Sequence, residues 1–322
     1  MTVIIVIALA AGAASATMFA SISSGALISL LLVYLAPLPL MLAAIAWGPL
    51  AAAIGGIAAC LALSVIFGLP LGIGYAISVA LPAWWLGHLV LLGRPVTNNA
   101  TSAQAVKDGD LEWYPVGRIL LWIACFAGLS TFAALLTIGT DAASITGVLR
   151  NFLLRVLAKN EVIPNDEIDQ WVDGLVLMAF AGAAVFSTIM LTLNLWLAAK
   201  ITAASGRLRR AWPDLRTAAL PPMTLAALCV AIALCFVGGL VAILALIVAS
   251  ALMMAYAFTG FAVLHTLTLP LKSRAFWLGS AYAIVLLFDW PVLAVALLGV
   301  ADAVFGFRAR YLRSRPPPLP AA

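Results

Sequence analysis

Four polar side chains interrupt long apolar stretches of the chain, and their chemistry could support an ion pair or a proton relay. They are His88, Asn194, His265 and Asp302. Each precedes a basic residue by six or seven positions, and these basic residues are Arg94, Lys200, Lys272 and Arg308. On helices that rise about 1.5 Å per residue, this spacing predicts one polar layer about 9–10 Å inside the membrane edge.

Asp302 is the anchor of this predicted layer, because an ionisable group inside a membrane is costly and is a functional candidate by default. Asp302 and Arg308 are six residues apart, and such a pair does not share a face of a continuous helix. We therefore expect an ionised Asp302 to find its partner on another helix, with His88 or His265 as the candidates. The alternative is that these polar residues lie near the membrane surface and make only local contacts.

The elements that carry these residues follow from composition. Of the 322 residues, 65% are hydrophobic and 9% are charged, and the mean hydropathy is +1.16. Soluble domains are about half apolar and a quarter charged, so a soluble or disordered protein is excluded. A spanning helix needs about 20 apolar residues. The chain is therefore predicted to be an all-α, polytopic transmembrane bundle of eight to ten helices, with candidate spans at 3–20, 24–47, 48–69, 71–93, 118–140, 174–199, 222–241, 243–268, 275–289 and 291–307.

Basic residues predict the orientation of the bundle. If the segment 200–216 is cytoplasmic, alternation of the spans places 94–117, 270–275 and the C-terminus on the same side. That side then holds 14 of the 17 Lys and Arg residues. Cytoplasmic loops of membrane proteins collect Lys and Arg, so both termini are predicted to lie inside, in a bacterial inner membrane. The net charge of +5 is explained by this topology, and no nucleic acid is expected.

The transmembrane domain is predicted to cover 1–308 and to be followed by a basic, proline-rich cytoplasmic tail at 309–322. Residues 94–117 and 200–216 form the predicted cytoplasmic loops. On the outer side, the segment 141–173 carries apolar residues at helical spacing, which predicts an amphipathic helix. This helix either lies on the membrane surface or packs over the outer mouth of the bundle.

Familiar enzyme signatures are absent from the sequence. It has no G-x-S-x-G, H-E-x-x-H or G-x-x-x-x-G-K-[ST] motif. Its two histidines lie far apart and its four cysteines form no C-x-x-C pair, so we expect no metal and no cofactor. We predict that the chain is not an enzyme and does not hydrolyse ATP through a phosphate-binding loop. Energised transport would then need a partner or an ion gradient.

Small residues recur along the first predicted helix at four-residue spacing. They are Ala8, Ala10, Gly12, Ala14 and Ala16. Small residues let two helix backbones approach closely in a membrane, so this stripe is a candidate docking face for another subunit. In a chain so rich in alanine, packing within the same chain is the alternative use.

The stretch from Gly299 to Arg308, with Asp302, Phe305 and Phe307 inside it, resembles the closing signature of the YybS-like family of bacterial membrane proteins. The resemblance implies a distant relation to the substrate-binding subunits of energy-coupling-factor transporters. Those helical bundles capture a vitamin on the outer side and dock on a transmembrane coupling subunit through small residues of an early helix. This chain has more predicted helices than their usual six and no vitamin-specific motif, so the fold is expected to carry over while the substrate is not.

Together these features predict a transporter-type subunit in the lipid bilayer that binds a small, vitamin-like molecule and depends on a coupling subunit with ATPases. Its ligand would enter from the outer side, beneath 141–173. The alternative is a non-transporting membrane protein that supports envelope assembly, and an intramembrane enzyme is a third, weaker alternative. A polar cavity on the outer side would favour the transporter-type subunit, and a filled bundle would favour the envelope-assembly protein. A cavity converging on Asp302 would favour the intramembrane enzyme or proton coupling.

Overall fold

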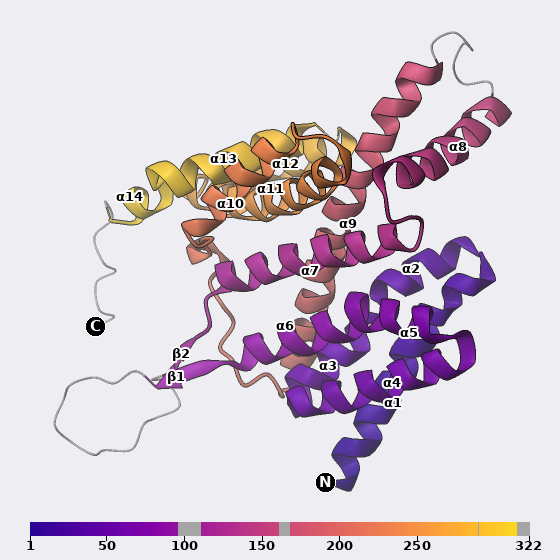
Figure 1. Ribbon diagram of the computed structural model, residues 1–322. Coiled ribbons are helices and arrows are strands. Elements are labelled where there is room, and N and C mark those ends of the chain that lie inside the picture. Colours follow the sequence, from indigo (N-terminus) through magenta and orange to yellow (C-terminus); the bar gives the residue numbers. More distant parts are fainter. Residues whose placement is uncertain (96–110, 161–167, 289, 314–322) are drawn as a thin grey trace.

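Helices dominate the fold (Figure 1). The computed structural model describes residues 1–95, 111–160, 168–288 and 290–313. The helices are α1 (Thr2–Ala20), α2 (Leu27–Leu35), α3 (Pro37–Trp47), α4 (Pro49–Phe67), α5 (Leu69–Tyr75), α6 (Leu81–Leu91), α7 (Val116–Leu136), α8 (Ala142–Asn160), α9 (Ile168–Ala204), α10 (Met223–Leu234), α11 (Gly239–Leu267), α12 (Arg274–Leu287), α13 (Pro291–Phe305) and α14 (Phe307–Arg313). Short 3₁₀ turns η1 (Ser21–Ser24) and η3 (Leu215–Thr217), a π-helical turn η2 (Ala76–Ala80), and strands β1 (Gly93–Pro95) and β2 (Leu111–Trp113) complete the described elements.

Seven helical segments in the described ranges are long and apolar enough to cross a membrane. They are Thr2–Ser24, Ile28–Trp47, Pro49–Phe67, Leu69–Leu91, Val116–Leu136, Trp171–Ala204 and Gly239–Leu267. Three further helices, α10, α12 and α13, are also apolar but shorter. The predicted all-α, multi-pass membrane class is confirmed, whereas the count of eight to ten spans and the inside position of both termini stay predictions.

Glycine and proline set the breaks between the first helices. Gly48 and Gly68 adopt φ of 105° and 94°, which side chains with a Cβ rarely tolerate, and each ends one helix where the next begins. Pro49 stands at the first position of α4, where a missing N–H costs nothing. Pro82 lies inside a continuous helical run and has no backbone N–H to donate to the preceding turn. The helix accommodates this missing hydrogen bond with a π-helical turn at Ala76–Ala80.

Two groups of helices are joined by α7 and α9 (Figure 1). The first group contains α1 to α6, and the second contains α10 to α14. Helix α9 contacts α3 in the first group, α11 in the second, and α7 between them. One continuous apolar core includes Leu40, Ile123 and Tyr256, which come from both groups and from α7. The groups are therefore packed as one body around α9.

Glycines bring several helix pairs into backbone contact. A Cβ at Gly12 of α1 would collide with the carbonyl oxygen of Gly55 in α4, and one at Gly55 would collide with the carbonyl of Ala8. Ala8 and Gly12 are accordingly buried, while Ala10 and Ala14 are exposed and Ala16 is half-buried. Part of the predicted docking stripe is thus used for packing within the chain, and Ala10 and Ala14 are the members that face outward.

Helix α8 occupies most of the predicted outer segment 141–173. Asp141 caps it by accepting hydrogen bonds from the Ser144 N–H (2.9 Å) and hydroxyl (2.8 Å), and these bonds lower the pKa of the Asp141 carboxyl. Ile145 is fully buried, whereas Phe152 is exposed, so α8 has a packed face and a free apolar face. In Figure 1, α8 and the start of α9 project beyond the other helices. Residues 161–167 of the segment lie outside the described residues.

The expected loop 94–117 begins and ends in regular structure. Strands β1 and β2 pair antiparallel, with Arg94 opposite Glu112, and the Arg94 Nε–Glu112 Oε2 distance is 2.7 Å. Residues 96–110 lie outside the described residues. Within the expected tail 309–322, α14 continues as a helix to Arg313, and residues 314–322 lie outside the described residues. Nothing in the structure tests the boundary placed at residue 308.

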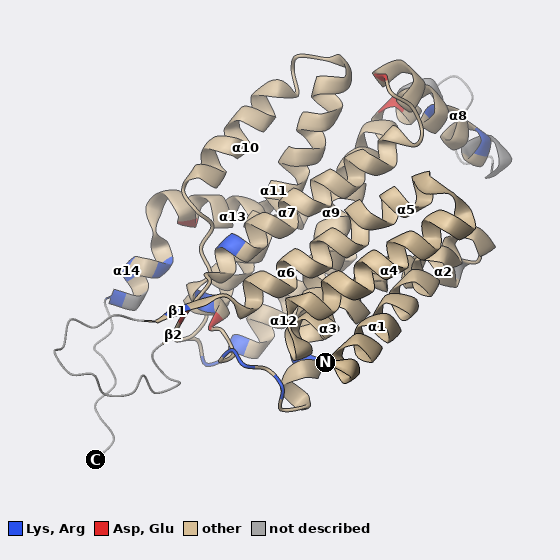
Figure 2. Cartoon of the chain, turned by 60° about the horizontal axis from the view of Figure 1, so that its bottom comes forward, with Lys and Arg blue, Asp and Glu red and all other residues tan. Residues whose placement is uncertain are grey.

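Lys and Arg residues of the described ranges gather in two places in Figure 2. One is the end of the bundle that carries β1, β2 and α14, and the other is α8. This distribution agrees with the partition of basic residues expected from the sequence. The side of the membrane on which each end lies remains a prediction.

The contact between α1 and α4 gives a first test. Replacing Gly12 by Val is expected to lower the free energy of unfolding by about 1–3 kcal/mol, because the added methyls must displace backbone rather than a flexible side chain. The matched control is Ala10→Val, which enlarges an exposed residue of the same helix. Thermal unfolding in detergent measures both, and an equal loss for the two variants would contradict the packing described here.

Candidate functional site

Asp302 pairs with Arg308, which corrects the expectation that His88 or His265 supplies its partner. The Arg308 backbone N–H donates to Asp302 Oδ1 at 2.9 Å, and its Nε donates to Oδ2 at 2.7 Å. The six-residue spacing argued against this pair only for a continuous helix. Helix α13 instead ends at Phe305, and Gly306, at φ 66°, turns the chain so that α14 folds back.

This ion pair is buried and fully engaged. The Asp302 and Arg308 side chains are 7% and 8% exposed. Arg308 Nη1 also donates to the carbonyls of Arg216 (2.9 Å) and Ala218 (2.8 Å), in the loop between α9 and α10. A cavity of about 400 Å³ adjoins the pair, with Thr217, Tyr256 and Thr259 among its lining residues. Both carboxylate oxygens are already hydrogen-bonded, so the arrangement holds α14 and the loop together rather than presenting a free acid.

The other residues of the predicted layer have separate partners. His265 Nε2 lies 2.8 Å from the Tyr282 hydroxyl, and Asn194 Nδ2 donates to the carbonyls of Tyr34 (2.7 Å) and Met190 (2.9 Å). His88 lies with its ring centroid 5.9 Å from that of Trp85. No hydrogen bond among the described residues joins any two of the four. They do not form one network.

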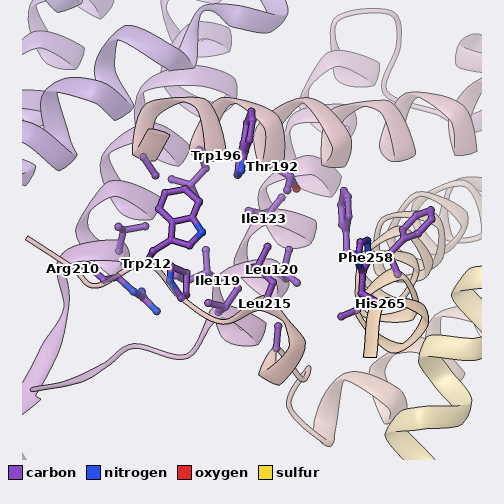
Figure 3. A pocket seen from close by; sticks show the side chains of 18 of the residues that line it. Ile119, Leu120, Ile123, Thr192, Trp196, Arg210, Trp212, Leu215, Phe258 and His265 are labelled. Atoms are coloured by element: carbon purple, nitrogen blue, oxygen red, sulfur yellow. The ribbon is translucent and has the colours of Figure 1, made fainter. Parts of the chain in front are cut away.

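A cavity of about 420 Å³ lies between α7, α9, α11, α12 and the loop 205–222, which we call the α9–α10 loop (Figure 3). Its walls are mainly apolar. The lining residues are Val90, Val116, Ile119, Leu120, Ile123, Thr192, Leu195, Trp196, Ala199, Leu208, Arg210, Trp212, Pro213, Leu215, Ala218, Phe258, Phe261, Ala262, His265 and Tyr282. None of them comes from 141–173, the segment beneath which the sequence led us to expect a ligand.

Arg210 is the charged residue of this lining. It comes from the α9–α10 loop and is only 9% exposed. Its Nη2 donates to the Tyr114 carbonyl at 3.0 Å, and burial lowers the pKa of the guanidinium. Trp212 lies beside it on the cavity wall, and the Lys200 ammonium lies 4.3 Å from the centre of the Trp212 ring. Positive charge is therefore concentrated at this end.

His265 and Tyr282 form the polar group at the other end of the cavity, where Figure 3 places His265 beside Phe258. The Tyr282 ring also stacks on Phe261, with centroids 5.0 Å apart and an interplanar angle of 11°. Arg274 Nη2 donates to the His265 carbonyl at 3.3 Å. These contacts connect α12 to α11 and hold Tyr282 at this end of the cavity.

His265 is the one member of the predicted layer that lines the large cavity, while Asp302 lines the smaller one. Sequence reasoning counted Arg210 only as a marker of topology. Its neighbour Trp212 was a weak signal, because a Trp so close to a basic residue also suits anchoring at a membrane surface. No three His, Cys, Asp or Glu side chains of the described ranges come together as a metal site.

Compared with protein-family models, with curated proteins and with solved structures, the chain gave no match. The resemblance of residues 299–308 to a family signature therefore remains a prediction. What the fold and the cavity define is a class: a helical, multi-pass membrane protein with a partly open apolar cavity beside a buried arginine.

The buried ion pair can be tested by comparison with an exposed one. Asp302→Asn is expected to lower the free energy of unfolding by about 3–5 kcal/mol, because Arg308 would stay buried without a counter-charge. The same substitution at Asp214, whose carboxylate lies 2.9 Å from Arg216 Nε and is 47% exposed, should cost about 1 kcal/mol or less. Chemical unfolding in mild detergent measures both, and similar losses would show that burial does not matter here.

Proposed function

We propose that this protein binds a small molecule with a mainly apolar body in the cavity beside Arg210, as the ligand-binding component of a transport system in a bacterial inner membrane. The observation that carries the proposal is the cavity itself. Ligand sites are typically apolar hollows of about 300–1,000 Å³ with a few placed polar groups. The cavity of about 420 Å³, with Arg210 at one end and the His265–Tyr282 pair at the other, fits this description.

Helix α12 can move with little loss of packing. None of its residues is buried, and the Tyr282 contacts with His265 and Phe261 are what hold its middle to α11. Because Tyr282 lines the cavity, a displacement of α12 would widen it. This supports a route for the ligand past α12, and the hydrogen bond between His265 and Tyr282 would have to break for the route to open.

The proposed entry differs from capture at the outer side. The cavity is lined by the α9–α10 loop, which lies in the basic segment 200–216 and which the charge pattern assigns to the cytoplasm. With both termini inside, the ligand is bound in the inner half of the membrane. The protein would then accept its ligand from, or deliver it to, the inner side. A coupling subunit with ATPases would supply the energy, because the sequence has no phosphate-binding loop of its own.

The two alternatives have less support. A non-transporting envelope protein needs no ligand-sized cavity, so the cavity beside Arg210 favours ligand binding. An intramembrane enzyme or a proton carrier built on Asp302 would need a carboxylate free to accept or donate a proton. Both oxygens of Asp302 are instead hydrogen-bonded by Arg308.

Filling the cavity tests the proposal. Ala199→Trp is expected to remove ligand binding with little loss of stability, because Ala199 lines the cavity and an indole would occupy its space. The matched control is Ala203→Trp, one turn further along α9 and exposed. Gentle purification followed by native mass spectrometry measures bound small molecules. A ligand retained equally by wild type and Ala199→Trp would show that the cavity is not its site.

The transport partner is tested separately. A photo-crosslinking residue at exposed Ala14 of α1 should capture a membrane subunit that is associated with ATPases, whereas one at exposed Ile57 of α4 serves as the control position. Native membranes at normal expression and identification by mass spectrometry are required. Capture of envelope-assembly proteins without any ATPase would overturn the coupling part of the proposal and leave ligand binding intact.

A further inference from the structure

The chemical class of the ligand can be inferred from Arg210, and this inference rests on the proposed function. Arg210 is more than nine-tenths buried, yet within the described residues its side chain makes a single hydrogen bond, from Nη2 to the Tyr114 carbonyl. A guanidinium has five N–H donors. Among the described residues, the ion pairs join Arg94, Arg150, Arg216 and Arg308 to carboxylates, and none of them includes Arg210.

A buried charge without a counter-charge is unfavourable, because little water remains to solvate it. The peptide carbonyl of Tyr114 satisfies one donor but supplies no negative charge. An anion that enters the cavity would complete the pairing, and the planar fork of arginine suits the two oxygens of a carboxylate or a phosphate. Lys200, whose ammonium is held over the Trp212 ring, adds a second positive charge near the same end.

The apolar wall of the cavity favours a ligand with a hydrocarbon body. Between Arg210 and His265 the wall shown in Figure 3 is formed by side chains such as Ile119, Leu120 and Leu215. These side chains offer no hydrogen bonds, so a polar ligand body would lose its hydration without compensation. An alkyl chain loses nothing by entering and gains packing contacts.

We propose that the cavity binds an anionic amphiphile: a carboxylate or phosphate head paired with Arg210, and an alkyl chain lying along the apolar wall toward His265. The head and chain chemistry is shared by free single-chain amphiphiles and by anionic bilayer lipids. Arg210 determines the preference for the anion, and the wall between Arg210 and His265 determines the preference for the chain.

The test uses the full chain in detergent and measures binding by native mass spectrometry and by shifts in melting temperature. The probes are dodecyl phosphate and dodecanoate, with dodecanol as the neutral control, dodecyltrimethylammonium as the cationic control and inorganic phosphate as the head alone. The two anionic probes are expected to bind about 10- to 100-fold more tightly than dodecanol, which is the range for one charge-assisted pair. Inorganic phosphate should bind far more weakly than dodecyl phosphate.

Two neighbouring arginines provide matched variants. Arg210→Gln is expected to reduce dodecyl phosphate binding to the level of dodecanol while leaving dodecanol binding unchanged. Arg209→Gln removes the same charge from the adjacent, exposed position and should keep the preference for the anion. The melting temperature of each variant without probe shows whether it folds. If Arg210→Gln misfolds, the comparison of head groups on the wild type still tests the inference, because it needs no variant.

The outcomes separate the inference from the proposed function. Equal binding of dodecyl phosphate, dodecanol and dodecyltrimethylammonium, lost in Ala199→Trp, would overturn the anionic class and keep the cavity as a ligand site. Equal binding of inorganic and dodecyl phosphate would overturn the role of the alkyl chain. Failure of every probe to bind would overturn the amphiphile class, whereas a different molecule retained by wild type and lost in Ala199→Trp would keep the proposed function.

A competition distinguishes the source of the ligand once the anion preference is found. Phosphatidic acid with two acyl chains is titrated against bound dodecyl phosphate. Displacement supports an anionic bilayer lipid as the ligand, and failure to displace supports a free single-chain amphiphile. Both results support the shared head and chain chemistry, and Arg210→Gln should weaken whichever molecule binds.

Discussion

Direct contact between helix backbones at glycine is the constraint on which the rest of this structure depends. Lipid offers no hydrophobic driving force between helices, so association relies on close packing. Gly12 meets Gly55 between α1 and α4, and Gly260 meets the Val295 carbonyl between α11 and α13. Gly299 meets the Tyr256 carbonyl on the same two helices. Any larger residue at these positions would separate the helices and change where the polar groups lie.

The same kind of contact places the candidate ligand site. Gly117, at the start of α7, lies against the Ala219 carbonyl of the α9–α10 loop, and Arg308 binds the Ala218 carbonyl next to it. The loop is thereby fastened to α7 on one side and to α14 on the other. Arg210 is carried on this fastened loop and reaches the cavity as a buried side chain. On a loop without these attachments, the Arg210 side chain would be exposed to water instead of buried at the cavity.

The glycine and the charged residues of the segment from Gly299 to Arg308 have a structural explanation. Gly299 allows α13 to approach α11, and Gly306 adopts the left-handed conformation that ends α13. The turn then returns Arg308 to Asp302. Such a pattern can therefore specify two helices that are joined by a glycine turn and linked by an ion pair at the edge of a bundle. The charged pair within it serves to hold α14 and the α9–α10 loop in place.

The sequence by itself determined the class of this protein, because long apolar runs and few charges leave a helical membrane bundle as the stable solution. It also singled out His265, which lines the cavity beside Arg210, and identified Ala8 and Gly12 as packing residues or a docking face. It could not find the partner of Asp302, since a single left-handed glycine changes which side chains meet. Nor could it distinguish Arg210 from Arg209, because adjacent residues of one basic loop differ only in burial. That difference is decided by contacts of the loop with residues about 90 to 100 positions away in the chain. Arg210 binds the Tyr114 carbonyl just before α7, at a separation of 96, and Arg308 of α14 binds the Ala218 carbonyl, at a separation of 90.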